Sequence, residues 1–138
     1  MNKSYLYMLL IVLFSSCVGK KIPKIERENN GFLVERVKRK GDCHIIYASK
    51  QDTLYKIVSK RTKVGKGLCD KIKIGKKYEF ILQSQKDFAP TINGVKINPV
   101  NFSGCYYYSV KTLICLEPEN GIWDLYTAKN IKGWYYCN

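Results

Sequence analysis

Short apolar and aromatic runs alternate with polar turn residues from position 42 onward. In residues 53–59 (TLYKIVS), a two-residue alternation places apolar side chains on both faces of a strand, so we expect both faces to be partly covered. Asn93-Gly94, between Ile92 and Val95, is the strongest short signal for a β-hairpin. No window of eleven residues shows a clear helical period. The strands that this pattern predicts are 43–49, 53–59, 78–84, 91–97, 105–110, 113–116, 122–128 and 133–137.

The pattern predicts an all-β domain over residues 42–138: a small, disulfide-stapled β-barrel or sandwich of seven or eight short strands, with an OB-like barrel as one arrangement. Tyr, Ile, Val and Phe are abundant in these runs and suit a pleated sheet. A short helix fits at 118–126 or at 124–132. A domain of this size buries only about 60 to 65% of its unfolded surface, so we expect disulfides to add stability.

Two segments of different character precede this domain. Residues 1–16 hold a lysine at position 3, an apolar run of ten residues at 5–14, and two serines. A helix that spans a bilayer needs about 20 apolar residues, so this segment fits a signal peptide. Residues 17–41 contain eight basic and three acidic residues. We expect a basic tether here, ending in a short strand or helical turn at 32–37.

Residues 13–17 read Leu-Phe-Ser-Ser-Cys and resemble the lipobox of bacterial lipoproteins. The resemblance implies that Cys17 receives a diacylglyceryl group, that the signal is cut before it, and that the new N-terminus is acylated. Val18 follows where an Asp would signal inner-membrane retention, which favours the outer membrane. We therefore expect a lipid-anchored protein of the cell envelope. The alternative is an ordinary secretory signal and a secreted protein.

Five more cysteines, Cys43, Cys69, Cys105, Cys115 and Cys137, are disulfide candidates in a small exported domain. They form at most two bridges, and we expect Cys43 to pair with Cys69, and Cys137 with Cys105 or Cys115. No pair has the spacing of a zinc knuckle, and the chain has one histidine. We therefore expect no metal site and no cofactor.

Candidates for catalysis are few. His44 is the only imidazole, and it follows Cys43 directly, so the two side chains point to opposite faces of a strand and cannot act as a base and its nucleophile. Glu117, Glu119 and Asp124 lie close in sequence, but acids gathered in one segment are more often a solvated turn. We therefore expect no catalytic residues, and an envelope enzyme ranks below a binding or structural role.

The charge of +13 is unevenly distributed. Residues 17–77 hold 18 basic and six acidic side chains, whereas residues 78–138 hold five of each. Beside a lipid anchor, such an excess suits anionic headgroups, an acidic polysaccharide or an acidic protein, and nucleic acid ranks last for an exported chain. The basic face that we expect comprises Lys60, Arg61, Lys63, Lys66, Lys71, Lys73, Lys76 and Lys77.

Aromatic residues supply a second indication. Segments 106–108 and 134–136 place aromatics on both faces of a strand, and we expect Tyr107, Trp134 and Tyr136 at a binding surface. Residues 75–82 (GKKYEFIL), with a cysteine upstream, resemble a strand of netrin-type and other oligonucleotide-binding-fold barrels, which are secreted and often inhibitory. Two hypotheses result: a membrane-anchored binding or structural lipoprotein with a basic face, and a secreted inhibitor-like or toxin-like β-module.

Overall fold

The computed structural model describes residues 30–64, 67, 69–89, 91–96 and 104–137. In this part of the chain the secondary structure is mainly strands, and the helical elements are two short 3-10 turns, η2 (Gln85–Phe88) and η3 (Pro118–Asn120). The expected all-β fold is therefore confirmed. The signal segment, Cys17, most of the expected tether, and Lys66 lie outside the described residues.

Three long strands form an antiparallel meander: β1 (Phe32–Lys40), β2 (Cys43–Lys50) and β3 (Thr53–Lys60). Two-residue turns join them, and Gln51 and Asp52 both have positive φ, as a type I′ hairpin requires. The expected strands at 43–49 and 53–59 are thus present, each one residue longer. The fold also begins earlier than the expected boundary at residue 42, because β1 pairs with β2 along nearly its whole length.

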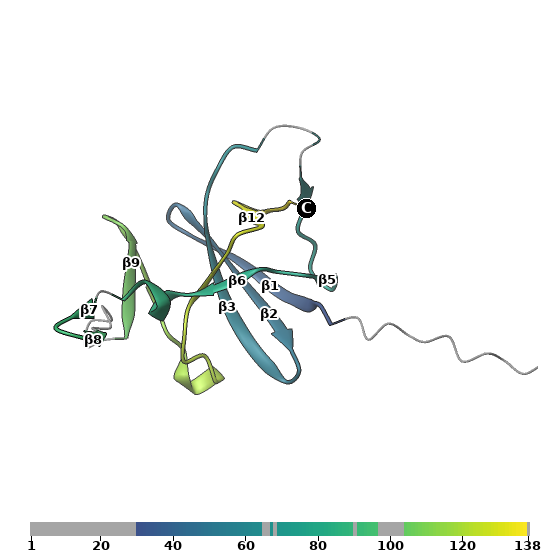
Figure 1. Cartoon of the computed structure of the whole chain (residues 1–138). Helices are drawn as coiled ribbons and strands as arrows, with labels where there is room; N and C mark the ends of the chain where they lie inside the picture. The colour runs from purple at the N-terminus through teal and green to yellow at the C-terminus, as the bar shows by residue number, and fades with distance from the viewer. Residues whose placement is uncertain (1–29, 65–66, 68, 90, 97–103, 138) are drawn as a thin grey trace, which may run out of the picture.

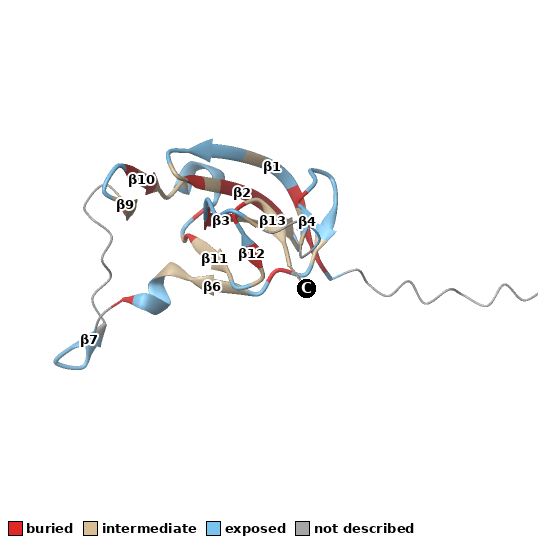
Figure 2. Cartoon of the chain, turned by 90° about the horizontal axis from the view of Figure 1, so that it is seen from above, coloured by how far each residue is buried: buried red, intermediate tan, exposed pale blue. Residues whose placement is uncertain are grey.

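The meander is the centre of a six-stranded sheet with the order β5-β1-β2-β3-β11-β6. Short strands complete it: β5 (Lys77–Tyr78) pairs with the start of β1, and β11 (Tyr126–Ala128) pairs in parallel with β3 and antiparallel with β6 (Leu82–Ser84). Figures 1 and 2 show that the sheet curls from β1 round to β6 as a half-barrel. The barrel that the sequence suggests is therefore only half closed.

Three smaller units surround this sheet. β9 (Cys105–Ser109) and β10 (Thr112–Cys115) form one hairpin. β7 (Thr91–Ile92) and β8 (Val95–Lys96) form the hairpin expected at Asn93-Gly94, and both turn residues have positive φ. The third unit is a three-stranded sheet of β12 (Ile131–Lys132), β13 (Tyr135–Tyr136) and β4 (Asp70–Lys71).

Several expected elements are shorter than the sequence suggests. Residues 78–84 split into the end of β5 and all of β6, with Phe80 buried between them. Of 122–128 only β11 is a strand, and of 133–137 only β13. The expected helix is the three-residue η3. The result is more strands than the seven or eight expected, several of only two residues, because the apolar runs lie in bends between strands as well as in strands.

The sheet is covered on both faces, as its alternation predicts. The concave side holds one buried cluster, and the convex side holds another under the β9–β10 hairpin. The concave cluster comprises Phe32, Val34, Ile46, Ala48, Ile57, Ile72, Phe80 and Ile131. The convex cluster comprises Cys43, Ile45, Tyr47, Val58, Tyr106, Ile114, Ile122 and Leu125.

Two disulfides stabilise the smaller units. Cys69 is bonded to Cys137 beside the β4–β13 pair, and Cys105 to Cys115 across the β9–β10 hairpin. The expected Cys43–Cys69 pairing is wrong, since Cys43 is a buried free thiol on the convex side of β2. The expected partners of Cys137 are wrong as well, because Cys105 and Cys115 face one another in register.

The turn between β1 and β2 provides a test of how the β9–β10 hairpin is held against the sheet. Gly41 has φ +57°, and a Cβ there would lie 2.2 Å from Thr112 Oγ1, which donates a 2.6 Å hydrogen bond to Asp42. We expect Gly41→Ala to lower the free energy of unfolding by about 2 kcal/mol, from the strained backbone and the displaced hydrogen bond. Urea unfolding of the mature chain measures this loss.

Gly121→Ala is the matched control. Its φ is +74°, but a Cβ there meets nothing within 4 Å, so only the backbone strain remains. Equal losses in the two variants would contradict a role for the Thr112 contact.

Candidate functional site

Four lysines line one cleft of about 460 Å³, together with two tyrosines and one aspartate. All four belong to the basic face that the sequence predicts, and their side chains are exposed. The lining residues are Asp70, Lys71, Lys73, Lys76, Lys77, Tyr78 and Tyr136. We refer to this hollow as the lysine cleft.

Three different connections hold the cleft together. Lys71 pairs with Tyr135 across β4 and β13, next to the Cys69–Cys137 disulfide. On the opposite side, Leu33 of β1 pairs with Lys77. The segment between β4 and β5 is attached to the same strand, because the Gly75 N–H donates to the Val34 carbonyl (2.7 Å) and the Val34 N–H donates to the Lys76 carbonyl (3.0 Å). The backbone that carries the lysines is therefore held in place by strand pairing and hydrogen bonds.

The two tyrosines give the cleft an aromatic part. The rings of Tyr78 and Tyr136 lie 5.1 Å apart, and both pack against the concave cluster. The Tyr78 hydroxyl accepts a 2.8 Å hydrogen bond from the Lys73 N–H, and the Tyr136 hydroxyl donates to the Glu79 carbonyl (3.4 Å). Because both rings are half-buried, they present a defined surface beside the amines.

The lining of the cleft carries more positive than negative charge. In the described part of the chain, no carboxylate forms an ion pair with the amine of Lys73 or Lys76. The Lys71 amine lies 4.5 Å from the centre of the Trp134 ring, a cation–π contact that leaves its charge in place. Asp70 is the single acid in the lining. The cleft is therefore suited to an anion.

A larger hollow of about 530 Å³ lacks this character. It lies where the start of β1 meets the β2–β3 turn, and its charged lining consists of Glu35, Asp52, Lys50 and Lys77. Two acids and two lysines leave it without net charge. We therefore place the candidate site in the lysine cleft and not in this larger hollow.

The remaining predicted binding residues lie elsewhere. Lys60, Arg61 and Lys63 are exposed at and after the end of β3 and do not line the cleft. Tyr107 is 71% exposed on the β9–β10 hairpin. Trp134 is half-buried, with its ring 5.5 Å from that of His44. Of the three predicted aromatics, only Tyr136 lines the cleft.

His44 and Cys43 lie on opposite faces of β2, as their adjacency predicts. The His44 ring is tilted by 42° against the Trp134 ring, and burial, with Arg61 and Arg39 nearby, lowers the pKa of its imidazole. Cys43 belongs to the convex cluster, and burial beside Asp42 raises the pKa of its thiol. The described residues hold no group of three or more His, Cys, Asp or Glu side chains placed to bind a metal ion.

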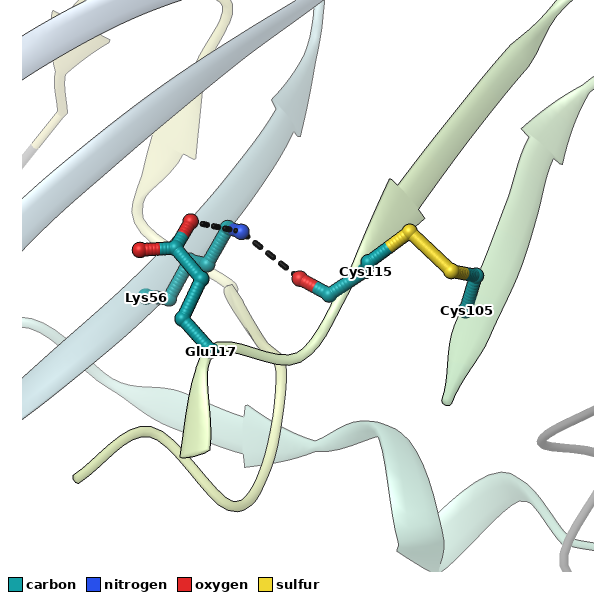
Figure 3. The surroundings of a disulfide bond; sticks show 4 residues. All are labelled: Lys56, Cys105, Cys115 and Glu117. Atoms are coloured by element: carbon teal, nitrogen blue, oxygen red, sulfur yellow. Dashed lines mark hydrogen bonds and ion pairs between the residues drawn. A yellow bond between two sulfur atoms is a disulfide. The ribbon is translucent and has the colours of Figure 1, made fainter. Parts of the chain in front are cut away.

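A buried ion pair lies on the convex face, where sequence reasoning did not place one. Lys56 of β3 is only 3% exposed, and its amine donates to the Glu117 carboxylate and to the Cys115 carbonyl (2.6 Å) (Figure 3). The Tyr47 hydroxyl donates to the same carboxylate at 2.7 Å. The expectation that Glu117 lies in a solvated turn is thus wrong. The sequence did contain one indication of this pair: Lys56 lies between apolar residues in a strand that was predicted to be covered on both faces.

Comparisons of the chain with protein-family models, with curated proteins and with solved structures give no match. Among the described residues, no helix has the length and apolar character that crossing a bilayer requires.

The ion pair generates a pH-dependent prediction. Burial opposes ionisation of Glu117, but hydrogen bonds from Lys56, Tyr47 and Asn120 outweigh it and lower the pKa from 4.5 to about 2. The ionised form therefore stabilises the fold above pH 4.5, and this contribution is lost as the pH falls towards 2. We expect Glu117→Gln to lower the free energy of unfolding by about 3 kcal/mol at pH 7, because Lys56 loses its counterion.

Urea unfolding at pH 7, 4 and 2.5 tests this expectation. The difference between the two proteins should shrink as the pH falls below 4.5, because Glu117 takes up a proton first in the unfolded chain and only near pH 2 in the folded one. Glu119→Gln, at an exposed position two residues away, is the control and should change little at any pH. A difference that stays constant from pH 7 to 2.5 would show that Glu117 is not stabilised as a carboxylate.

Proposed function

We propose that this chain is an exported, lipid-anchored binding module that holds an anionic ligand in the lysine cleft. The observation that carries the proposal is the gathering of Lys71, Lys73, Lys76 and Lys77 around one hollow with a single aspartate. The width of a hollow of this volume is comparable to the Debye length, about 8 Å at physiological salt, so the four charges act together on one ligand.

The structure of the cleft favours a binding role over simple solubility. Lysines that serve solubility can extend into water separately, whereas these four are held on backbone fixed by β1, β13 and a disulfide. Holding like charges together is unfavourable in the absence of a counterion, and a bound anion relieves that repulsion. An anionic ligand is therefore the simplest explanation of the arrangement.

Export and anchoring rest on the first seventeen residues and agree with the cysteine chemistry. The two disulfides are typical of an oxidising compartment. Two or more acyl chains on Cys17 would hold the chain on its membrane essentially permanently. The anchored segment would join the fold beside the cleft, because Phe32, the first residue of β1, pairs with Tyr78. A cleft at this position would meet ligands within reach of the segment between Cys17 and Phe32, at most about 50 Å from the membrane surface.

The anchor has a direct test. We expect the mature protein from a bacterial host to begin at Cys17 and to carry diacylglyceryl and acyl groups, as measured by mass spectrometry of the N-terminal peptide. Cys17→Ala should move the protein out of the membrane fraction. A mature N-terminus that lies downstream of position 17 would instead favour the secreted, inhibitor-like module.

The cleft has a separate test with a matched control. We expect the mature chain to bind a short sulfated oligosaccharide, and Lys71→Gln/Lys73→Gln/Lys76→Gln to weaken that binding at least tenfold, since three of the four attracting charges are removed. Calorimetric titration at two salt concentrations measures it, and added salt should weaken wild-type binding.

The control removes the same charge outside the cleft. Lys60→Gln/Arg61→Gln/Lys63→Gln lowers the net charge equally, but its residues do not line the cleft, so its affinity should stay within about threefold of wild type. Equal weakening in the two triple variants would mean that net charge, and not the cleft, determines binding.

A further inference from the structure

A second cationic hollow, of about 280 Å³, lies where the end of β1 meets the β9–β10 hairpin. The buried ion pair described above lines it, together with residues from the end of β1. The lining residues are Lys38, Arg39, Lys40, Ile45, Tyr47, Lys56, Ile114, Cys115 and Glu117. We refer to it as the hairpin hollow.

The charge of the hairpin hollow is also unopposed. Glu117 is the only acid in its lining, and its carboxylate is already bound by Lys56 and Tyr47. No carboxylate in the described part of the chain forms an ion pair with Lys38, Arg39 or Lys40. Lys38 and Lys40 therefore flank a hollow whose lining contains one acid, Glu117, which is already paired with Lys56. The Arg39 side chain lies on the opposite face of β1, beside His44.

One strand connects this hollow with the lysine cleft. Val34 of β1 is hydrogen-bonded to Gly75 and Lys76 at the cleft, and the hairpin hollow begins at Lys38 of the same strand. A strand rises about 3.3 Å per residue, so Val34 lies about 13 to 20 Å from Lys38 to Lys40. The tyrosines of the cleft pack on the concave cluster and the hairpin hollow lies on the convex side, so a ligand that reaches both crosses the open edge of β1. Figure 2 shows the exposed second half of β1 running towards β10. Glu35 and Arg36 lie between the hollows; Glu35 is exposed, and the Arg36 guanidinium is 4.0 Å from the centre of the Tyr47 ring.

We propose that the two hollows are the ends of one binding track along β1 that takes a linear acidic polysaccharide. The inference rests on the proposed function and names its ligand class. A chain with an anionic group on successive sugars satisfies both hollows at once, whereas a single phosphate or sulfate fills only one. The half-buried rings of Tyr78 and Tyr136 provide faces for the apolar side of a sugar.

The open edge of β1 argues against an acidic peptide as the occupant. β5 covers this edge only at Phe32 and Leu33, so the later part of β1 has no strand partner on that side among the described residues. A peptide would add a strand there, but exposed lysines such as Lys38 and Lys40 are a common means of discouraging strand addition. The side chains of the track therefore suit a ligand held by its charged substituents.

A length series tests the proposal. The full mature chain is titrated with sulfated oligosaccharides of two, six and twelve sugars that have equal charge per sugar; the shortest is too short to span both hollows. We expect wild-type affinity to rise about 100-fold or more between the shortest and longest chains, because a chain that spans both hollows binds the second one intramolecularly. An affinity that rises only in proportion to the number of binding registers would overturn the track.

Two variants assign the effect to the hairpin hollow. Lys38→Gln/Arg39→Gln/Lys40→Gln should keep the wild-type affinity for the two-sugar chain and lose the gain with length. Lys111→Gln/Lys129→Gln/Lys132→Gln removes the same charge from exposed positions outside both hollows and should keep the gain. All variants change exposed side chains, and equal urea midpoints confirm that they are folded. A length gain that persists in the first variant would refute the inference.

The proposed function and this inference fail in distinguishable ways. No binding of the two-sugar chain to wild type would overturn the lysine cleft itself. Tight, cleft-dependent binding without any length gain would overturn only the track. Binding of polyglutamate equal to that of the twelve-sugar chain, with hydrogen-exchange protection of amides 35–40, would overturn the polysaccharide in favour of an acidic peptide.

Discussion

The contact between Lys56 and Glu117 determines how this small domain is assembled. Lys56 lies in the middle of β3 and is buried from water, so its ammonium group needs partners inside the protein. The Cys115 carbonyl and the Glu117 carboxylate are these partners. Cys115 is the last residue of β10, and Glu117 lies two residues after it. These contacts fix the position of the β9–β10 hairpin against the sheet, and in this position the hairpin covers the convex cluster.

With both faces of the sheet covered, the molecule presents its charge along its edges. The lysine cleft lies at the β4–β5 side of β1, and the hairpin hollow lies at the far end of the same strand. Each is bordered by a disulfide, Cys69–Cys137 in one case and Cys105–Cys115 in the other. The two crosslinks that stabilise a small core thus also fix the backbone from which the basic side chains project.

The sequence predicted what local alternation determines and failed where distant segments meet. β2, β3 and the Asn93-Gly94 hairpin followed from apolar spacing and turn chemistry alone. The disulfide pairing did not, because Cys69 meets Cys137 only through the pairing of two-residue strands, which no local pattern reveals. The lysines at 71–77 were predicted to act together, and they line one hollow. Their separation from Lys60 was not predicted, because it depends on how the sheet curves. The burial of Glu117 was not predicted for the same reason.

The Cys69–Cys137 bond has a consequence for the order of events in the life of the protein. It joins residues 68 positions apart, and the cleft wall made by Tyr136 exists only once β13 has reached β4. Such long-range closure comes late in folding, after the meander can already form. If the chain is exported as we propose, it would leave the cytoplasm before this bond forms, and oxidation would then lock the Tyr136 wall of the cleft in place.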